Sequence, residues 1–179
     1  MTQTNTPQAE SVEPKTKAEL IERIRTARAQ LDRIVAGLDE ATLSAPGPEG
    51  WSVKDHLAHL AAWGRKVLGN MDGRSSPEVL GVPEDVYQRG DWIEINEFVR
   101  APDKDRSARE VLAEYRRVHA TLLQRIAALP AAELFGADER LLGNIAGNSY
   151  GHDDEHRPWI EAVLAAAAPP TRRRMPPGG

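Results

Sequence analysis

Two histidines near the carboxyl end of the chain have the spacing of a ligand pair. His152 and His156 lie four residues apart in a stretch that we expect to be helical, so both rings project from one side of the helix. Ile145, Trp159 and Val163 fall close to the same line, which indicates that this side faces the interior. Burying polar rings without compensation is unfavourable, so the pair needs hydrogen-bond partners, a proton-transfer role or a metal ion.

A third histidine for such a site is expected from the helix that begins at Ser52. This helix carries His56 and His59, and an ideal helical wheel places His56 nearer the centre of the aliphatic stripe. If Ser52 is the N-cap, however, Trp51 and His56 occupy the two positions that touch in a hydrophobic staple. His59 is then free to point into the interior. His119, on another helix, is interpreted as a surface histidine or one with its hydrogen bonds satisfied.

Three neutral imidazoles with an open fourth position form the catalytic type of metal site. A cation held in this way lowers the pKa of its bound water towards about 7 or acts as a Lewis acid towards a substrate oxygen. Glu155, Asn148 and Asp55 lie within a turn of the histidines and are the candidate catalytic residues, as acceptors for the rings or as a general base. The alternatives are an N-cap role for Asp55 and a solvated helix face for Glu155. A metalloprotease H-E-x-x-H motif is not favoured, because Asp153 stands where the glutamate would be.

The elements that position these residues are four amphipathic helices. Capping-box spacings begin at Thr16, Ser52 and Ser107, and apolar residues follow each of them at helical intervals. A glycine and an asparagine at 69–70 are expected to stop the second helix, and Pro130 to end the third, with a single further turn over 130–135. Without a convincing strand, the pattern predicts an all-α four-helix bundle. The expected helices cover residues 17–37, 52–68, 107–129 and 141–167.

The connection between the second and third helices is unusually long. Residues 71–106 contain no long periodic segment, and a connection of this length in a small domain is typical of a lid or binding loop. Its one amphipathic stretch, residues 91–99, would form a roof across an open end of the bundle. Trp63, Trp92 and Asn96 are the candidate substrate-binding residues, whereas Trp159 is interpreted mainly as a core aromatic.

Three glycines recur every fourth residue in the last helix, at Gly143, Gly147 and Gly151. Each costs about 1 kcal/mol against alanine in a helix, so the repeat indicates that another backbone approaches closely. That neighbour is either the first helix or a second subunit.

Length and composition restrict the class of protein. The chain has 179 residues, which fits a single domain over 16–167, preceded by a disordered leader at 1–15 and followed by a basic, proline-rich disordered tail at 168–179. Because there is no cysteine, a transition metal must be bound by histidine and carboxylate. A net charge of -4 without a broad basic face argues against nucleic acid as a partner of the folded part. No apolar run or signal region is present, so we expect a cytoplasmic protein with no membrane partner.

Short motifs in two helices resemble the DinB-like superfamily of four-helix bundles. They are the stretch from Trp51 to Trp63 and the Asn-x3-His-x3-His-x2-Trp-Ile pattern of residues 148–160. Residues 92–96 and 144–148 are similar to the ClbS/DfsB branch, which includes a self-resistance protein that opens a reactive cyclopropane in a genotoxin. In superfamily members that bind metal, a histidine of the second helix joins the H-x3-H pair of the last. The resemblance therefore implies His59, His152 and His156 as ligands of a divalent metal, zinc or nickel.

The resemblance also implies three functions to be compared. The first is a metal-dependent hydrolase that acts on a small electrophilic or toxic molecule in detoxification or self-resistance. The second is a transferase or isomerase of the same fold, which would need an external thiol. The third is a non-enzymatic, stress-related metal-binding bundle. Homodimers are common in the superfamily, so the resemblance is compatible with a homodimer.

Overall fold

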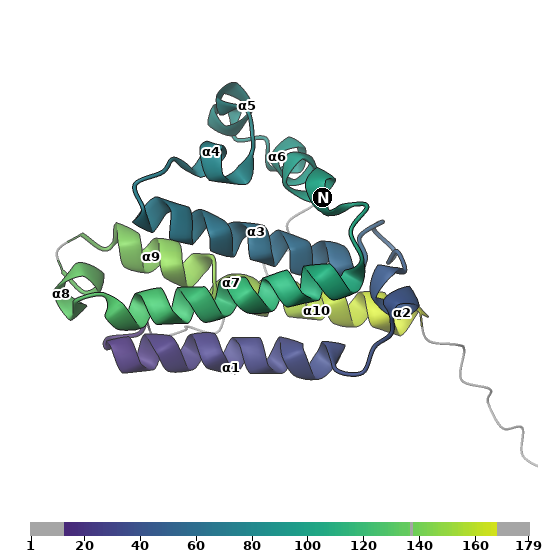
Figure 1. Ribbon diagram of the computed structural model, residues 1–179, viewed down its shortest axis with the longest axis horizontal. Coiled ribbons are helices and arrows are strands. Elements are labelled where there is room, and N and C mark those ends of the chain that lie inside the picture. Colours follow the sequence, from purple (N-terminus) through teal and green to yellow (C-terminus); the bar gives the residue numbers. More distant parts are fainter. Residues whose placement is uncertain (1–12, 137, 168–179) are drawn as a thin grey trace, which may run out of the picture.

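The structure is a computed structural model that describes residues 13–136 and 138–167. These residues form helices and no β-strand, and Figure 1 shows the long helices lying side by side as a bundle. α3 packs against α7 and α10, and α1 packs against the same two helices from the other side. The predicted all-α four-helix bundle is therefore confirmed. The long helices are α1 (Lys17–Val35), α3 (Val53–Met71), α7 (Ala108–Ala128) and a fourth made of α9 (Arg140–Gly147) and α10 (Tyr150–Ala167).

The starts of three bundle helices are fixed by their caps, as the sequence predicts. At α3, the Asp55 amide donates to the Ser52 hydroxyl, and the Ser52 amide donates to the Asp55 carboxylate at 2.8 Å. Ser107 forms the same reciprocal pair at the start of α7, and the Thr16 hydroxyl accepts from the backbone at the start of α1. Each cap satisfies backbone amides that the helix itself leaves unpaired.

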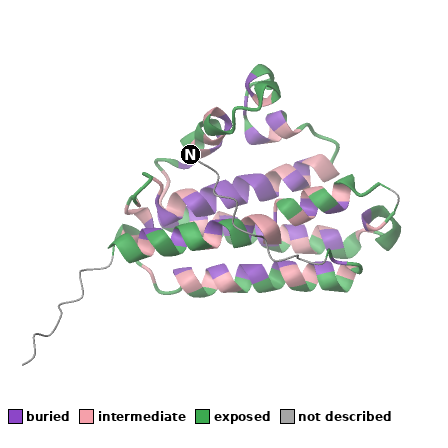
Figure 2. Ribbon diagram, turned by 180° about the vertical axis from the view of Figure 1, so that it is seen from behind, coloured by how far each residue is buried: buried purple, intermediate pink, exposed green. Residues whose placement is uncertain are grey.

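The apolar faces of the four helices meet in the centre of the bundle. Figure 2 shows α3 buried along most of its length. Leu31, Leu57 and Ile160 belong to one core cluster and are fully buried. Ile24, Leu122 and Ile145 belong to a second cluster, and they are also fully buried or nearly so. This rigid core fixes the orientation of the polar side chains that α3 and α10 direct towards each other.

α3 continues past the glycine that was expected to stop it. Gly69 lies inside the helix, which ends at Met71, so the predicted end was wrong. The reason is tertiary packing: a Cβ at Gly69 would collide with the side chain of Val79. Glycine here makes room for α4 (Ser76–Leu80), which packs on α3.

The long connection is built of short helices. It contains α4, α5 (Glu84–Arg89), α6 (Trp92–Arg100) and a 3-10 turn (Ala101–Asp103). Another short helix, α2 (Glu40–Ser44), belongs to the connection from α1 to α3. The predicted amphipathic stretch is α6, whose Ile95 and Val99 are buried in a cluster with Trp63. α6 therefore packs on the middle of α3, rather than across an open end of the bundle.

The last helix is broken, although the sequence pattern predicts one continuous helix over residues 141–167. α9 ends at Gly147 and α10 begins at Tyr150. The Asn148 side chain donates to the Asn144 carbonyl at 2.7 Å, and the Ser149 hydroxyl donates to the Ile145 carbonyl at 2.6 Å. The Asn148 backbone amide also donates to the Asn144 carbonyl, at 3.2 Å, so side chain and backbone share this acceptor. Side-chain bonds of this kind to the preceding turn bend or interrupt helices.

The glycine repeat does not mark a close approach of α1. A Cβ added at Gly143 or Gly147 would touch nothing within 4 Å, and one at Gly151 would meet only the backbone of Ala146 in α9. The first of the two alternatives, a close approach of α1 to these glycines, was wrong. Gly143 and Gly147 are exposed, so a second subunit at this face stays a prediction.

The predicted leader and tail lie outside the described residues, except for residues 13–15. Among the described helices, none combines the length and apolar composition that crossing a bilayer requires.

Candidate metal centre

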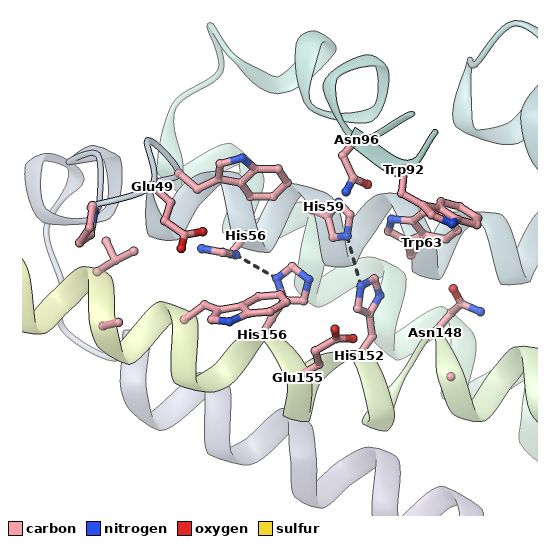
Figure 3. Close-up of a pocket in the computed structure, with 16 residues that line it drawn as sticks. Glu49, His56, His59, Trp63, Trp92, Asn96, Asn148, His152, Glu155 and His156 are labelled. Carbon is pink, nitrogen blue, oxygen red and sulfur yellow. Dashed lines mark hydrogen bonds between the residues drawn. The ribbon is translucent and has the colours of Figure 1, made fainter. Parts of the chain in front are cut away.

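A cavity of about 450 Å³ opens between α3, α10, α6 and the turn before α3. Figure 3 shows histidines from α3 and α10 facing each other across it. The lining is mostly aromatic and apolar, with a few polar groups, as is typical of small-molecule sites. The lining residues are Pro48, Glu49, Trp51, His56, His59, Trp63, Trp92, Asn96, Gly147, Asn148, His152, Glu155, His156, Trp159, Ala162 and Val163.

Three histidines in this cavity lie close enough to share one metal ion. One ring nitrogen from each of His59, His152 and His156 lies within 4.8 Å of the others. The Nε2 atoms of His59 and His152 are 3.2 Å apart. Two nitrogens bound to one tetrahedral zinc ion lie about 3.3 Å apart, given Zn–N bonds of about 2.0–2.1 Å. The structure thus brings together the three residues that the sequence analysis singled out, and their donor set fits a metal.

The fourth histidine of the cluster contacts the third ligand candidate. His56 and His156 are joined by a hydrogen bond between their Nδ1 atoms at 2.9 Å. His56 also packs under Trp51 with the rings 5.2 Å apart, as the hydrophobic staple predicts. When Nδ1 of His156 is the donor, its Nε2 carries a lone pair and is available to a metal. This role of His56 was missed, because the sequence does not show which side chain lies opposite it.

Burial keeps the imidazoles neutral at physiological pH. Removal from water lowers the pKa of His56 to about 4, and it lowers that of His152 to about 4 with help from the positive charge of Lys66. Burial, followed by the neighbouring histidines, holds the pKa of His59 and of His156 well below its ordinary value. Neutral imidazole is the form that binds metal, so the cluster needs no deprotonation at pH 7.

These pKa shifts predict that the metal-free protein loses stability in weak acid. In the unfolded chain His56 and His152 take up protons below pH about 6.5, whereas in the folded protein they do so only near pH 4. The contribution of these neutral histidines to the free energy of unfolding is therefore largest above pH 6.5. It falls as the pH drops towards 4, by about 2 kcal/mol per histidine at pH 5. Urea unfolding in chelator at pH 7 and pH 5 measures this loss. A His56→Gln, His152→Gln variant should show a smaller difference, and equal stability of the wild type at both pH values would contradict the account.

The candidate catalytic residues have different surroundings. Glu155 and Asn148 line the cavity, and Glu155 is exposed. The Asp55 carboxylate accepts from the Ser52 amide and hydroxyl and is not among the lining residues, so it has the capping role considered as its alternative. None of the three is hydrogen-bonded to a histidine ring in the described structure. The buried Nδ1 atoms of His59 and His152 have no hydrogen-bond partner there.

The candidate substrate-binding residues all line the cavity. Trp63 is nearly buried, whereas Trp92 is 54% exposed, and Asn96 lies on the same helix as Trp92. Trp159, interpreted from the sequence as a core aromatic, also lines the cavity and is 47% exposed. That interpretation was wrong, because α10 turns Trp159 towards the cavity mouth next to His156, with the rings 4.8 Å apart.

His119 belongs to a buried network outside the cavity. Its Nε2 lies 3.3 Å from the Asp153 carboxylate, which also accepts from the Tyr115 hydroxyl at 3.1 Å. His119 therefore has its hydrogen bond satisfied, as one of the two interpretations expected. The partner Asp153 was missed, although an aspartate on an inward-facing turn of a helix is a signal that such a bond is required.

One model of a known protein family matches most of the chain. The model described as the DinB superfamily matches residues 23–160. The chain belongs to the DinB superfamily. No curated protein sequence matches it significantly.

Solved structures with the same DinB fold include three informative neighbours. The colibactin self-resistance protein ClbS, solved in complex with double-stranded DNA, has a TM-score of 0.72 and 20% identity, over 87% of this chain and 99% of ClbS. The sibling lethal factor precursor DfsB has a TM-score of 0.70 and 21% identity, over 83% of this chain and 95% of DfsB. An uncharacterised Escherichia coli UTI89 protein has a TM-score of 0.70 and 17% identity, over 86% and 95% of the two chains. At these identities the similarity shows the fold alone.

The ClbS complex corrects one expectation. Nucleic acid was excluded as a partner from the net charge and the lack of a broad basic face. ClbS has the same fold and was solved with double-stranded DNA, so that exclusion was wrong. A net-charge argument averages over the whole surface, whereas a DNA contact depends on the local arrangement of charges.

Proposed function

We propose that this DinB-superfamily protein is a metal-dependent hydrolase that acts on a small electrophilic or toxic molecule. The observation that supports this most strongly is the cluster of His59, His152 and His156 in an aromatic cavity. Three neutral nitrogens suit zinc or nickel better than magnesium or calcium, which prefer oxygen ligands. When bound, such a cation supplies Lewis-acid activation of water or of a substrate oxygen.

The protein residues around the cluster have separate tasks in this proposal. Glu155 lines the cavity and has no ion-pair partner in the described structure, so its carboxylate is free to take a proton from the attacking water. Asn148 offers an amide oxygen, because its amide nitrogen donates to Asn144. Trp63, Trp92 and Asn96 hold the substrate at the opposite wall and exclude bulk water.

His56 is expected to set the metal affinity without being a ligand. Accepting a hydrogen bond from Nδ1 of His156 would fix the tautomer in which Nε2 binds metal. Replacing His56 with phenylalanine should lower the affinity for zinc about 10- to 100-fold and leave the stoichiometry unchanged. Competition with a chromophoric chelator measures this change. His119→Phe is the matched control, because it alters a buried histidine outside the cluster, and an unchanged affinity in His56→Phe would refute the role.

Hydrolysis is tested with a panel of small electrophiles, including epoxides, activated esters and cyclopropyl ketones. Because a protein of this fold was solved with double-stranded DNA, duplex DNA belongs in the same panel. We expect turnover that requires zinc or nickel and that is lost in the presence of chelator and in the His59→Ala variant. Turnover that appears only with an added low-molecular-weight thiol would instead assign the transferase or isomerase, since the chain has no cysteine. Metal binding without turnover of any substrate would favour a non-enzymatic protein.

A further inference from the structure

All four tryptophans of the chain line the one cavity that holds the histidine cluster. Trp51 and Trp159 lie against His56 and His156, with ring centroids 5.2 and 4.8 Å apart. Trp63 and Trp92 lie 6.1 Å apart at the His152 end, where Figure 3 shows them together. Broad indole faces on both sides of a cavity suit a flat, largely apolar molecule, which would also cover the half-exposed rings of Trp92 and Trp159.

One of these tryptophans has an unused hydrogen-bond donor. Trp63 is 7% exposed, and its Nε1 is buried without a hydrogen-bond partner in the described structure. Buried indole N–H groups normally have an acceptor, because an unpaired one loses its hydrogen bond to water and gains no other in return. Trp63 lines the cavity, so a ligand bound there lies against this indole.

The charges around the cavity are unequal at its two ends. Near Trp63, the Lys66 ammonium lies 5.1 Å from the centroid of the indole and donates to Asn144, whose side chain accepts in turn from Asn148. At the other end, Glu49 lines the cavity, and Figure 3 shows it beside His56, whereas the Glu155 carboxylate lies between His156 and His152. The positive charge beside Trp63 favours a ligand group with negative charge there, and the Glu49 carboxylate disfavours such a group at the His56 end.

We propose that the cavity binds a flat, apolar molecule that carries a carboxylate or carbonyl oxygen, and that Trp63 Nε1 donates a hydrogen bond to this oxygen. The inference rests on the proposed function, since it names the substrate class of the same site. It places the oxygen at the His152 end of the cavity, with the apolar rings of the molecule lying between the indoles.

Two probes with the same ring system and opposite charge test this inference. 2-Naphthoate and 2-naphthylmethylammonium are titrated into the full chain by calorimetry, with chelator present and again with zinc. We expect 2-naphthoate to bind at least about tenfold more tightly, as one charge-assisted hydrogen bond and a favourable field imply. Trp63→Phe keeps an aromatic ring but removes the N–H, and it should cancel most of this preference. Lys66→Met should also weaken the binding of 2-naphthoate, whereas Trp92→Phe should change the affinity for both probes by the same factor.

Equal binding of the two probes, tighter binding of the ammonium, or a preference unchanged in Trp63→Phe would overturn the inference. Metal content is measured on the same samples, so that the two proposals fail separately. A wild type that prefers 2-naphthoate but holds no metal keeps the inference and refutes the metal site. A wild type that holds metal but shows no preference refutes the inference alone.

Discussion

Replacing His59 or His152 with alanine is expected to abolish stoichiometric metal binding. Each substitution removes one of three donors whose nitrogens lie within 4.8 Å of one another, and the two that remain do not hold a first-row ion tightly. We expect the affinity for zinc to fall at least roughly 100-fold, more than for the loss of a group that only supports a ligand. Elemental analysis of untagged protein measures the occupancy, and chelator competition measures the affinity.

His119→Gln is the control for this comparison, because His119 is buried but lies outside the cluster and bonds to Asp153. It should retain the metal content of the wild type. About one zinc or nickel ion per chain in His59→Ala and His152→Ala would show that the metal is held elsewhere. The melting temperature of the wild type, measured with and without chelator, is a second readout, since a ligand that binds only the folded state raises it.

Removing the Asp153 carboxylate is expected to cause the largest loss of stability among polar substitutions near the site. Asp153 is 3% exposed and accepts hydrogen bonds from Tyr115 and His119, so alanine would leave two buried groups on α7 unpaired. We expect Asp153→Ala to lower the free energy of unfolding by about 3 kcal/mol. In a domain of this size, that corresponds to a fall in melting temperature of about 6–12 °C.

Asp154→Ala is the matched control for this prediction, because it changes the neighbouring aspartate in the same helix. Asp154 is exposed and pairs only with Arg157, three residues away, so its loss should cost less than about 0.5 kcal/mol. Equal melting temperatures for the two variants would show that the buried network does not stabilise the attachment of α10 to α7.

The sequence predicted those parts of the fold and site that depend on local patterns. Capping residues such as Ser52 and Ser107 fix the helix starts through contacts within four residues, and a short-range rule describes them. The pairing of His152 with His156 follows from helical spacing. The choice of His59 over His56 as their partner followed from the staple between Trp51 and His56, which the structure contains.

The features that the sequence did not predict depend on contacts between distant segments. Gly69 continues α3 because Val79 packs over it, and no rule about glycine as a helix stop includes that neighbour. His56 lies 100 positions from His156, its hydrogen-bond partner. Asp153 likewise finds His119 on another helix. The break before α10 is local, but it arises from the Asn148 and Ser149 side chains, which also occur within continuous helices.

The most direct test of the metal centre is an X-ray absorption spectrum of the protein loaded with one equivalent of zinc. We expect three imidazole ligands with Zn–N distances of about 2.0–2.1 Å and one further light-atom ligand. In His152→Ala, the imidazole signal should fall or the metal should be lost. A spectrum without multiple imidazole scattering, or a wild type that retains no zinc after gel filtration, would contradict the proposal that His59, His152 and His156 form a metal centre.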